Sequence, residues 1–200
     1  MLSGGVAVFI SILGAYLPYT FVTGFTPGPN NIIALYAISQ QGWQQGQKVI
    51  LGIAAGFISV MLVCALFCYE LARYAPAITG GLKYLGAAYI VYLATQIACS
   101  KPSTSQSYQI SFWKAFFLQF ANVKIILFAI TAHTVYTIPY EGDLTQILLH
   151  SLCMSIVGIA GTLTWATAGG ILQSFLQKHY RPFNITMALI LLYCAVSMFI

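Results

Sequence analysis

No Asp, Glu, Lys or Arg occurs between Met1 and Gln47, and most residues of this stretch are apolar. The rest of the chain is similar, because only 6% of its 200 residues are charged and 60% are hydrophobic. Soluble domains carry about 25% charged residues, which cover their surface. A chain with so few charges must bury its surface in lipid. We therefore expect an integral membrane protein with one transmembrane domain, residues 1–200.

Six apolar runs are long enough, or nearly long enough, to cross a bilayer as helices. A hydrocarbon core of ~30 Å needs about 20 helical residues, and short polar connections separate the runs. We therefore predict an all-α fold, a polytopic bundle of six transmembrane helices. The predicted spans are Val6–Phe25 with its extension Asn31–Ser39, Val49–Leu71, Leu82–Ala98, Phe112–Tyr136, Leu144–Leu172 and Pro182–Ile200.

The polar segment 100–111 divides these runs into halves of three, about 1–100 and 111–200. An odd number of spans per half predicts opposite orientations, as in inverted-repeat transporters with a site at the midplane. The N-terminal run lacks the features of a signal peptide, so we expect it to remain in the mature protein. Basic residues beside alternate connections predict a cytoplasmic face and outward-facing termini. These residues are Lys48, Lys101, Lys114, Lys178 and Arg181.

The sequence TPGPNN, Thr26–Asn31, places two prolines and a glycine inside the first apolar run. A single helix over residues 6–39 would be about 50 Å long, which exceeds the thickness of the bilayer core. The two prolines must interrupt it. Irregular backbone inside a membrane is tolerated only where it is enclosed by protein or lines a cavity. The break therefore indicates a functional site, with a simple proline kink as the alternative.

A helix is predicted to restart directly after this break. Gly28 precedes a proline, which disfavours helical geometry, and proline suits the first position of a helix. We therefore predict that Gly28 is the N-cap and that Pro29 begins the helix. The backbone N–H groups of Asn30 and Asn31 would then lack intrahelical acceptors and would face an anion at the positive end of the helix dipole.

Asn122 and Lys124 interrupt the fourth apolar run, and His133 follows in the same run. Ionisable residues inside a membrane are costly and mark functional sites. We predict that Lys124 belongs to a site, although a lysine near the membrane boundary can also extend to the interface. His133 is a candidate for proton coupling, with a hydrogen-bonded interior histidine as the alternative.

The remaining motifs narrow the class of function. Neither G-x-x-x-x-G-K-[ST] nor H-E-x-x-H occurs, and the net charge of +5 lacks the basic, aromatic clusters of nucleic-acid binding. We predict a secondary transporter with no catalytic residue, cofactor, metal or nucleic-acid partner. A membrane enzyme, a packing subunit and a thiol–disulfide protein, given Cys64 and Cys68 at i and i+4, remain open. The Gly52–Gly56 pair predicts close helix packing, within the bundle or between subunits of a homo-oligomer.

Three segments resemble motifs of the LysE/RhtB amino-acid exporter family. They are "TPGPNNIIALYAISQQGWQQGQKVILGIAAGF", "LKYLGAAYIVYLA" and "SFWKAFFLQFANVKIILFAIT", in the family's order. The family usually has Asn-Pro-Lys where this chain has Asn122-Val123-Lys124, so a kink-forming proline is missing. The Asn-Val-Lys form, with "FNITMALILLYCAVSMF" near the end, resembles the members that export cysteine and O-acetylserine. The resembling motif residues are Thr26, Pro27, Gly28, Pro29, Asn30, Asn31, Gly52, Gly56, Asn122 and Lys124.

The resemblance implies a bacterial inner-membrane exporter of small amino acids, with homoserine or threonine as alternative substrates. We expect the substrate carboxylate at the helix that restarts at Pro29, with Lys124 as a second positive group. Carbonyl groups or aromatic faces would receive the ammonium. The predicted substrate-binding residues are Thr26, Gly28, Pro29, Asn30, Asn31, Asn122 and Lys124.

Overall fold

The computed structural model describes residues 2–26, 28–74, 76–99, 110–140 and 143–197. Every regular element within these residues is a helix, which confirms the predicted all-α class. The elements are α1 (Leu2–Phe25), α2 (Pro29–Tyr74), α3 (Pro76–Cys99), α4 (Phe112–Phe120), α5 (Val123–Thr131), the π-helix η1 (Ala132–Thr137), α6 (Leu144–Thr167) and α7 (Gly169–Ser197).

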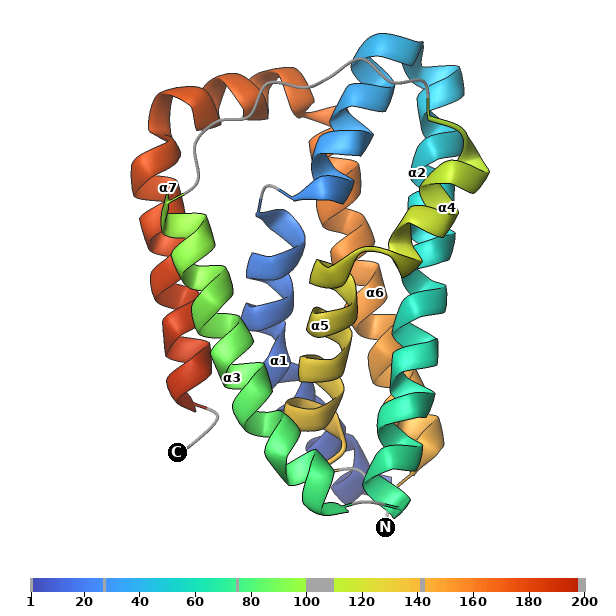
Figure 1. Cartoon of the computed structure of the whole chain (residues 1–200), viewed down its shortest axis with the longest axis vertical. Coiled ribbons are helices and arrows are strands. Elements are labelled where there is room, and N and C mark those ends of the chain that lie inside the picture. Colours follow the sequence, from blue (N-terminus) through green and yellow to red (C-terminus); the bar gives the residue numbers. More distant parts are fainter. Residues whose placement is uncertain (1, 27, 75, 100–109, 141–142, 198–200) are drawn as a thin grey trace.

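The helices form an elongated bundle whose axes run mostly along its length (Figure 1). α2 packs mainly against α6 and α4, α3 packs against α7, and α1 packs against α6. Gln41–Tyr74 and Leu144–Thr167 are each long and apolar enough to cross a membrane, and α4 with α5–η1 forms a third, bent candidate. Ile10–Phe25 and Asn184–Tyr193 are shorter apolar helices. The predicted spans at 49–71 and 144–172 therefore coincide with membrane-type helices.

α2 consists of two helices that meet at Gly42. This residue has φ 72° and ψ 169°, a conformation that glycine adopts at little cost and other residues rarely adopt. The chain reverses there, so residues 29–41 continue the direction of α1 and residues 43–74 run back along the bundle (Figure 1). The connection predicted between the first two apolar runs is therefore a turn at Gly42, and the residues on either side of it are helical.

One predicted boundary in the second half is wrong. α6 ends at Thr167, not at Leu172, because Ala168 leaves the helical region with φ −92° and ψ 10° and two glycines follow. α7, like α2, consists of two helices, and they meet at a kink at His179 with φ −121° and ψ 24°. This kink lies in the polar gap between the predicted spans 144–172 and 182–200.

Gly52 and Gly56 allow α2 to lie directly against α4. A Cβ atom at Gly56 would lie 2.5 Å from the Phe116 carbonyl oxygen and 2.6 Å from Gln119 Cγ. A Cβ atom at Gly52 would collide with the Phe112 carbonyl oxygen. The packing that this motif predicted therefore occurs within the chain.

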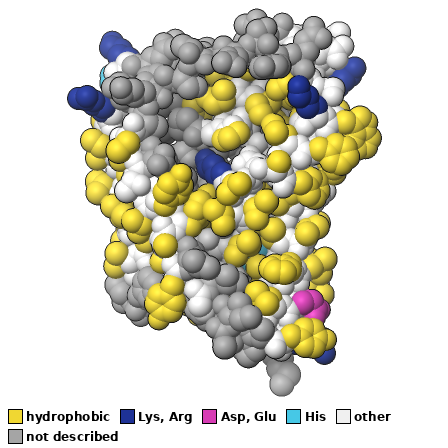
Figure 2. Space-filling model, viewed as in Figure 1, with side chains coloured by type: hydrophobic (Ala, Val, Ile, Leu, Met, Phe, Trp, Pro, Cys, Tyr) yellow, Lys and Arg dark blue, Asp and Glu magenta, His cyan; other side chains and the backbone are white. Residues whose placement is uncertain are grey.

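Most charged side chains lie at the two ends of the bundle, and hydrophobic side chains cover much of the face between them, where one Lys or Arg side chain also reaches the surface (Figure 2). Among the described residues, the charged side chains exposed at the end with the Gly42 turn and the α7 bend are basic, whereas those exposed at the opposite end are two acidic residues and one arginine. The basic set is Lys48, Lys114, Lys178 and Arg181, and the mixed set is Glu70, Arg73 and Asp143. Lys101, Glu141 and the side chain of Lys83 lie outside the described residues.

Candidate functional site

The first helix break lies where the sequence predicted it. α1 ends at Phe25 and α2 begins at Pro29. The Gly28 carbonyl accepts a hydrogen bond from the Ile32 N–H at 3.0 Å, so Gly28 is the N-cap of α2. Asn30 and Asn31 therefore occupy the first turn, where a helix leaves backbone N–H groups without intrahelical acceptors.

Side chains from α2 and α6 satisfy the carbonyl groups that α1 leaves open at this break. Asn31 Nδ2 donates to the Gly24 carbonyl at 2.7 Å and to the Thr26 carbonyl at 2.9 Å. Trp165 Nε1 donates to the Phe25 carbonyl at 2.9 Å. Unsatisfied carbonyls would be costly in an apolar environment, so these hydrogen bonds stabilise the non-helical backbone at the break.

Asn31 consequently has a structural role that the sequence did not indicate. Its Oδ1 atom accepts a hydrogen bond from Thr162 Oγ1 at 3.2 Å, while both of its N–H groups serve carbonyls of the break. We expected the Asn31 side-chain carbonyl and the freed backbone carbonyls to be available for a substrate ammonium. Instead, the Asn31 carbonyl accepts from Thr162, and the backbone carbonyls accept from Asn31 and Trp165.

We expect Trp165→Phe to lower the free energy of unfolding by about 1–3 kcal/mol, because it leaves the partly buried Phe25 carbonyl without its donor. Thermal unfolding in detergent would measure this change. Trp113→Phe is the matched control, because Trp113 is 63% exposed on α4, and it should stay within about 0.5 kcal/mol of wild type. Equal stability of the two variants would contradict the assigned role of Trp165.

A second break separates α4 from α5, with a bend of 53°. Asn122 is the N-cap residue of α5, and its carbonyl accepts from the N–H groups of Ile125 and Ile126 at 3.0 and 3.2 Å. The kink-forming proline that the family usually has at this position is missing, yet the helix breaks at Ala121–Asn122.

A chain of three amide side chains joins the two breaks. Asn30 Nδ2 donates to Gln119 Oε1 at 2.8 Å, and Asn122 Nδ2 donates to Asn30 Oδ1 at 3.4 Å. Gln119 Nε2 in turn donates to the Ala115 carbonyl at 2.9 Å. Gln119 is fully buried, and the sequence analysis did not identify it. The only feature of the sequence that could have indicated a role for Gln119 is its polar side chain within the apolar run of α4.

Lys124 extends from α5 toward the first break. Its Nζ atom donates to Thr26 Oγ1 at 3.4 Å. A Cβ atom at Gly28 would lie 2.8 Å from the same Nζ atom, so a side chain at position 28 would displace the ammonium group. Glycine at position 28 is therefore both the N-cap residue of α2 and the reason that Lys124 can come so close to the break.

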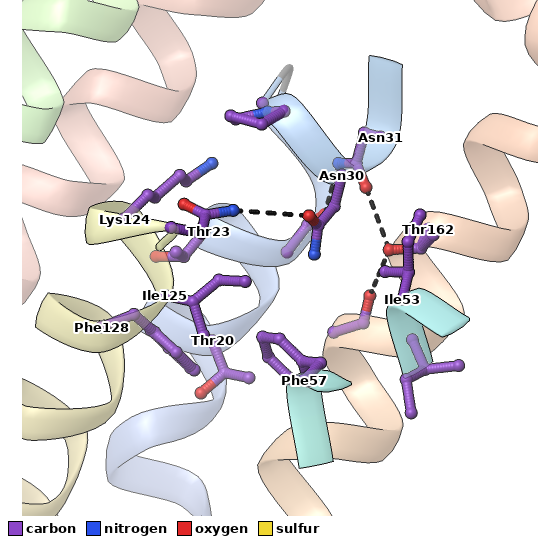
Figure 3. A pocket seen from close by; sticks show the side chains of 16 residues that line it. Thr20, Thr23, Asn30, Asn31, Ile53, Phe57, Lys124, Ile125, Phe128 and Thr162 are labelled. Atoms are coloured by element: carbon purple, nitrogen blue, oxygen red, sulfur yellow. Dashed lines mark hydrogen bonds between the residues drawn. The ribbon is translucent and has the colours of Figure 1, made fainter. Parts of the chain in front are cut away.

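The two breaks and Lys124 surround a cavity of about 50 Å³. This volume has room for roughly three to five water molecules, at about 10–15 Å³ each, which corresponds to a small solute. Of the seven predicted binding residues, Gly28, Pro29, Asn30, Asn31, Asn122 and Lys124 line the cavity, while Thr26 lies beside it and contacts Lys124. Figure 3 shows the cavity with Lys124 and Asn30 on different sides of it. The sequence analysis missed its hydroxyl groups and apolar wall, namely Thr20, Thr23, Thr162, Ile53, Phe57, Ile125 and Phe128.

The electrostatic character of the cavity is positive. α2 and α5 both begin at its wall, and each helix start carries about half a positive elementary charge. Lys124 adds a full charge, and no Asp or Glu belongs to the lining. Such a site favours an anionic group such as a carboxylate.

His133 does not belong to this cavity. It lies in η1, is fully buried, and makes hydrogen bonds with Thr137 Oγ1 at 3.2 Å and Ser151 Oγ at 2.9 Å. A second buried pair, His150 and Tyr16, is joined by a 3.1 Å hydrogen bond. His133 is therefore a hydrogen-bonded interior histidine in a separate polar cluster, and proton coupling remains a hypothesis for it.

Within the described part of the chain, no metal-binding cluster and no disulfide bond is present. Its His, Cys, Asp and Glu residues form no group of three or more that could hold a metal ion. Cys64, Cys68, Cys99 and Cys153 are free thiols, and the first two are buried in the core.

Comparisons with known proteins identify the family of the chain. The LysE type translocator family matches residues 21–200. Cysteine/O-acetylserine efflux proteins of Escherichia coli O139:H28 (strain E24377A / ETEC), Escherichia coli (strain K12) and Shigella sonnei (strain Ss046) are each 42% identical over 191 residues. Each alignment covers 94% of this chain and 98% of the relative. No solved structure matches the chain. The chain therefore belongs to the LysE type translocator family and is a membrane transporter rather than an enzyme.

Proposed function

We propose that this transporter exports small zwitterionic amino acids, with cysteine and O-acetylserine as its main substrates, from the bacterial cytoplasm across the inner membrane. The 42% identity to cysteine/O-acetylserine efflux proteins over nearly the whole chain supports this substrate class. Homoserine and threonine are the alternative substrates.

The observation that carries the proposal is the convergence of Lys124 and two helix starts on one small cavity. The α-carboxylate of the substrate binds Lys124 Nζ and the first-turn N–H groups of α2, beside Asn30. An ammonium group without a counter-ion is costly in an apolar cavity. A substrate carboxylate supplies that counter-ion, and its charged hydrogen bonds are stronger than those of a neutral ligand.

The substrate ammonium binds the side-chain carbonyl of Asn122, which lines the cavity. The other carbonyls predicted for this role already accept hydrogen bonds within the protein. Asn31 Oδ1 accepts from Thr162, and the open carbonyls of α1 accept from Asn31 and Trp165.

An arrangement of six spans in two inverted halves explains why the chain contains two helix breaks. Each half then opens with a broken helix, between α1 and α2 in the first half and between α4 and α5 in the second. The two breaks face each other through Asn30 and Asn122, as expected for a site between inverted repeats. The end rich in exposed basic residues is cytoplasmic, and transport occurs as the halves rock around the cavity. The cavity lies within one chain, so each subunit of any homo-oligomer carries its own site.

Uptake into inside-out membrane vesicles tests this function. We expect uptake of radiolabelled O-acetylserine and of cysteine, kept reduced, to exceed that of a broader panel of amino acids and to fall when the proton gradient is collapsed. In the same assay, His133→Gln should retain substrate exchange but lose its dependence on the gradient. Uptake of no amino acid would refute export, whereas gradient-independent wild-type uptake would refute proton coupling through His133.

A further inference from the structure

Two threonine hydroxyl groups on α1 line the cavity without a hydrogen-bond partner. Thr20 and Thr23 lie one turn apart, and their side chains are only 1% and 7% exposed. Neither Oγ1 atom has a donor or acceptor partner within the described residues. Buried polar groups are nearly always hydrogen-bonded, and an unpaired one is costly to the fold. These two hydroxyls therefore need an explanation.

Other hydroxyl groups in the helices of this chain bond to their own backbone. Thr134 donates to the Ile130 carbonyl at 2.8 Å, and Thr186 donates to the Pro182 carbonyl at 2.9 Å, each four residues earlier. The same i−4 bond is made by Ser59, Ser155, Thr164 and Thr167. Thr20 and Thr23 lack this bond although α1 offers the same carbonyl positions. Their hydroxyl groups are thus available to a molecule in the cavity.

The surroundings of the two threonines differ from those of the charged part of the cavity. In the view of Figure 3, Thr23 lies toward Lys124, and Thr20 lies among Ile125, Phe128 and Phe57. All of these residues line the same cavity. A ligand whose carboxylate binds Lys124 would extend its side chain toward this apolar wall. It would meet two hydrogen-bond donors in otherwise apolar surroundings.

We propose that Thr20 and Thr23 bind the side chain of the transported amino acid. Their hydroxyls donate to the ester carbonyl oxygen of O-acetylserine, and the acetyl methyl group contacts Phe57 and Phe128. This assignment rests on the proposed function, because the carboxylate at Lys124 sets the orientation. A cysteine thiol is a weaker acceptor than an ester carbonyl, so the two hydroxyls favour O-acetylserine. A site built to hydrogen-bond one group discriminates against analogues that lack it.

Kinetics in inside-out vesicles test this subsite. Thr20→Val and Thr23→Val keep the branched shape and remove the hydroxyl, so each should raise the KM for O-acetylserine about two- to tenfold. The inhibition constant of 2-aminobutyrate, whose side chain carries no acceptor, should stay the same or fall. Thr20→Ser and Thr23→Ser should restore the KM. Thr186→Val, which removes an exposed hydroxyl bonded to its own helix, is the control and should have no effect.

The outcomes separate a failed subsite from a failed transport proposal. An unchanged KM in both valine variants, with normal wild-type uptake, would overturn the subsite and leave the transport function intact. An equal loss of affinity for O-acetylserine and 2-aminobutyrate would also overturn it, because a general change in the cavity would then be responsible. Wild-type vesicles that take up neither O-acetylserine nor cysteine would refute the transport function and the subsite with it.

Discussion

Replacing Lys124 by alanine should reduce the efflux of O-acetylserine and cysteine by about 30-fold or more. Truncating one partner of a buried, hydrogen-bonded charge pair costs about 2–5 kcal/mol, and tenfold in binding corresponds to about 1.4 kcal/mol. Lys124 is the only charged side chain among the residues that line the cavity. Lys124→Met, which keeps most of the volume without the charge, should show the same loss. Efflux from cells with matched amounts of each variant in the membrane would measure the effect.

Lys114→Ala is the matched control for this experiment. Lys114 lies ten residues earlier, on the exposed surface of α4, and does not line the cavity. Its removal should leave efflux unchanged. Wild-type efflux from both Lys124 variants would show that the substrate carboxylate binds elsewhere and would exclude the cavity as the transport site.

Gly56→Ala should both destabilise the protein and impair transport. The added Cβ would lie 2.5 Å from the Phe116 carbonyl oxygen, which is backbone and cannot rotate away. Overpacking of this kind typically costs about 1–3 kcal/mol. The same Cβ would lie 2.6 Å from Gln119 Cγ, so it should also disturb the hydrogen bond between Gln119 and Asn30. Thermal unfolding in detergent and efflux per molecule in the membrane would measure the two effects separately.

Gly14→Ala provides the comparison, because a Cβ atom at Gly14 would meet nothing within 4 Å. It should be neutral or slightly stabilising, since alanine is favoured over glycine in helices by roughly 1 kcal/mol. If Gly56→Ala matched Gly14→Ala in stability and efflux, the close packing of α2 on α4 would not be needed for transport.

The first helix break was predictable because its causes are local. Two prolines and a glycine within Thr26–Asn31 determine where α1 must end and where α2 can begin, and the length of the apolar run requires an interruption. The prediction of the N-cap at Gly28 is confirmed by the Ile32 hydrogen bond. The partners that complete the break were not predictable, because Trp165 lies 140 residues away from Phe25 in the sequence.

The second break shows where local reasoning fails. Nothing in Ala121–Asn122 excludes a continuous helix, and the family's proline is absent. The bend coincides with tertiary contacts, namely the packing of α4 on Gly52 and Gly56 and the hydrogen bond from Asn122 to Asn30. Sequence patterns report such contacts only indirectly.

Thr20 and Thr23 were missed for a related reason. A threonine in an apolar helix usually donates to its own backbone, as Thr134 and Thr186 do, so the residue type alone indicates no function. Only the orientation of the hydroxyl distinguishes Thr20 and Thr23 from these others, and that orientation depends on the packed structure.

The hydrogen bonds from Asn31 and Trp165 to the end of α1 also bear on the transport cycle. Because protein side chains already satisfy these carbonyls, the unwound segment keeps its shape whether or not cargo is bound. An exporter must return to the cytoplasmic-facing state without cargo after each release. A carrier whose binding segment depended on substrate for its hydrogen bonds would be trapped at that step, whereas we expect this one to return empty. We therefore expect net one-way export in preference to obligatory exchange.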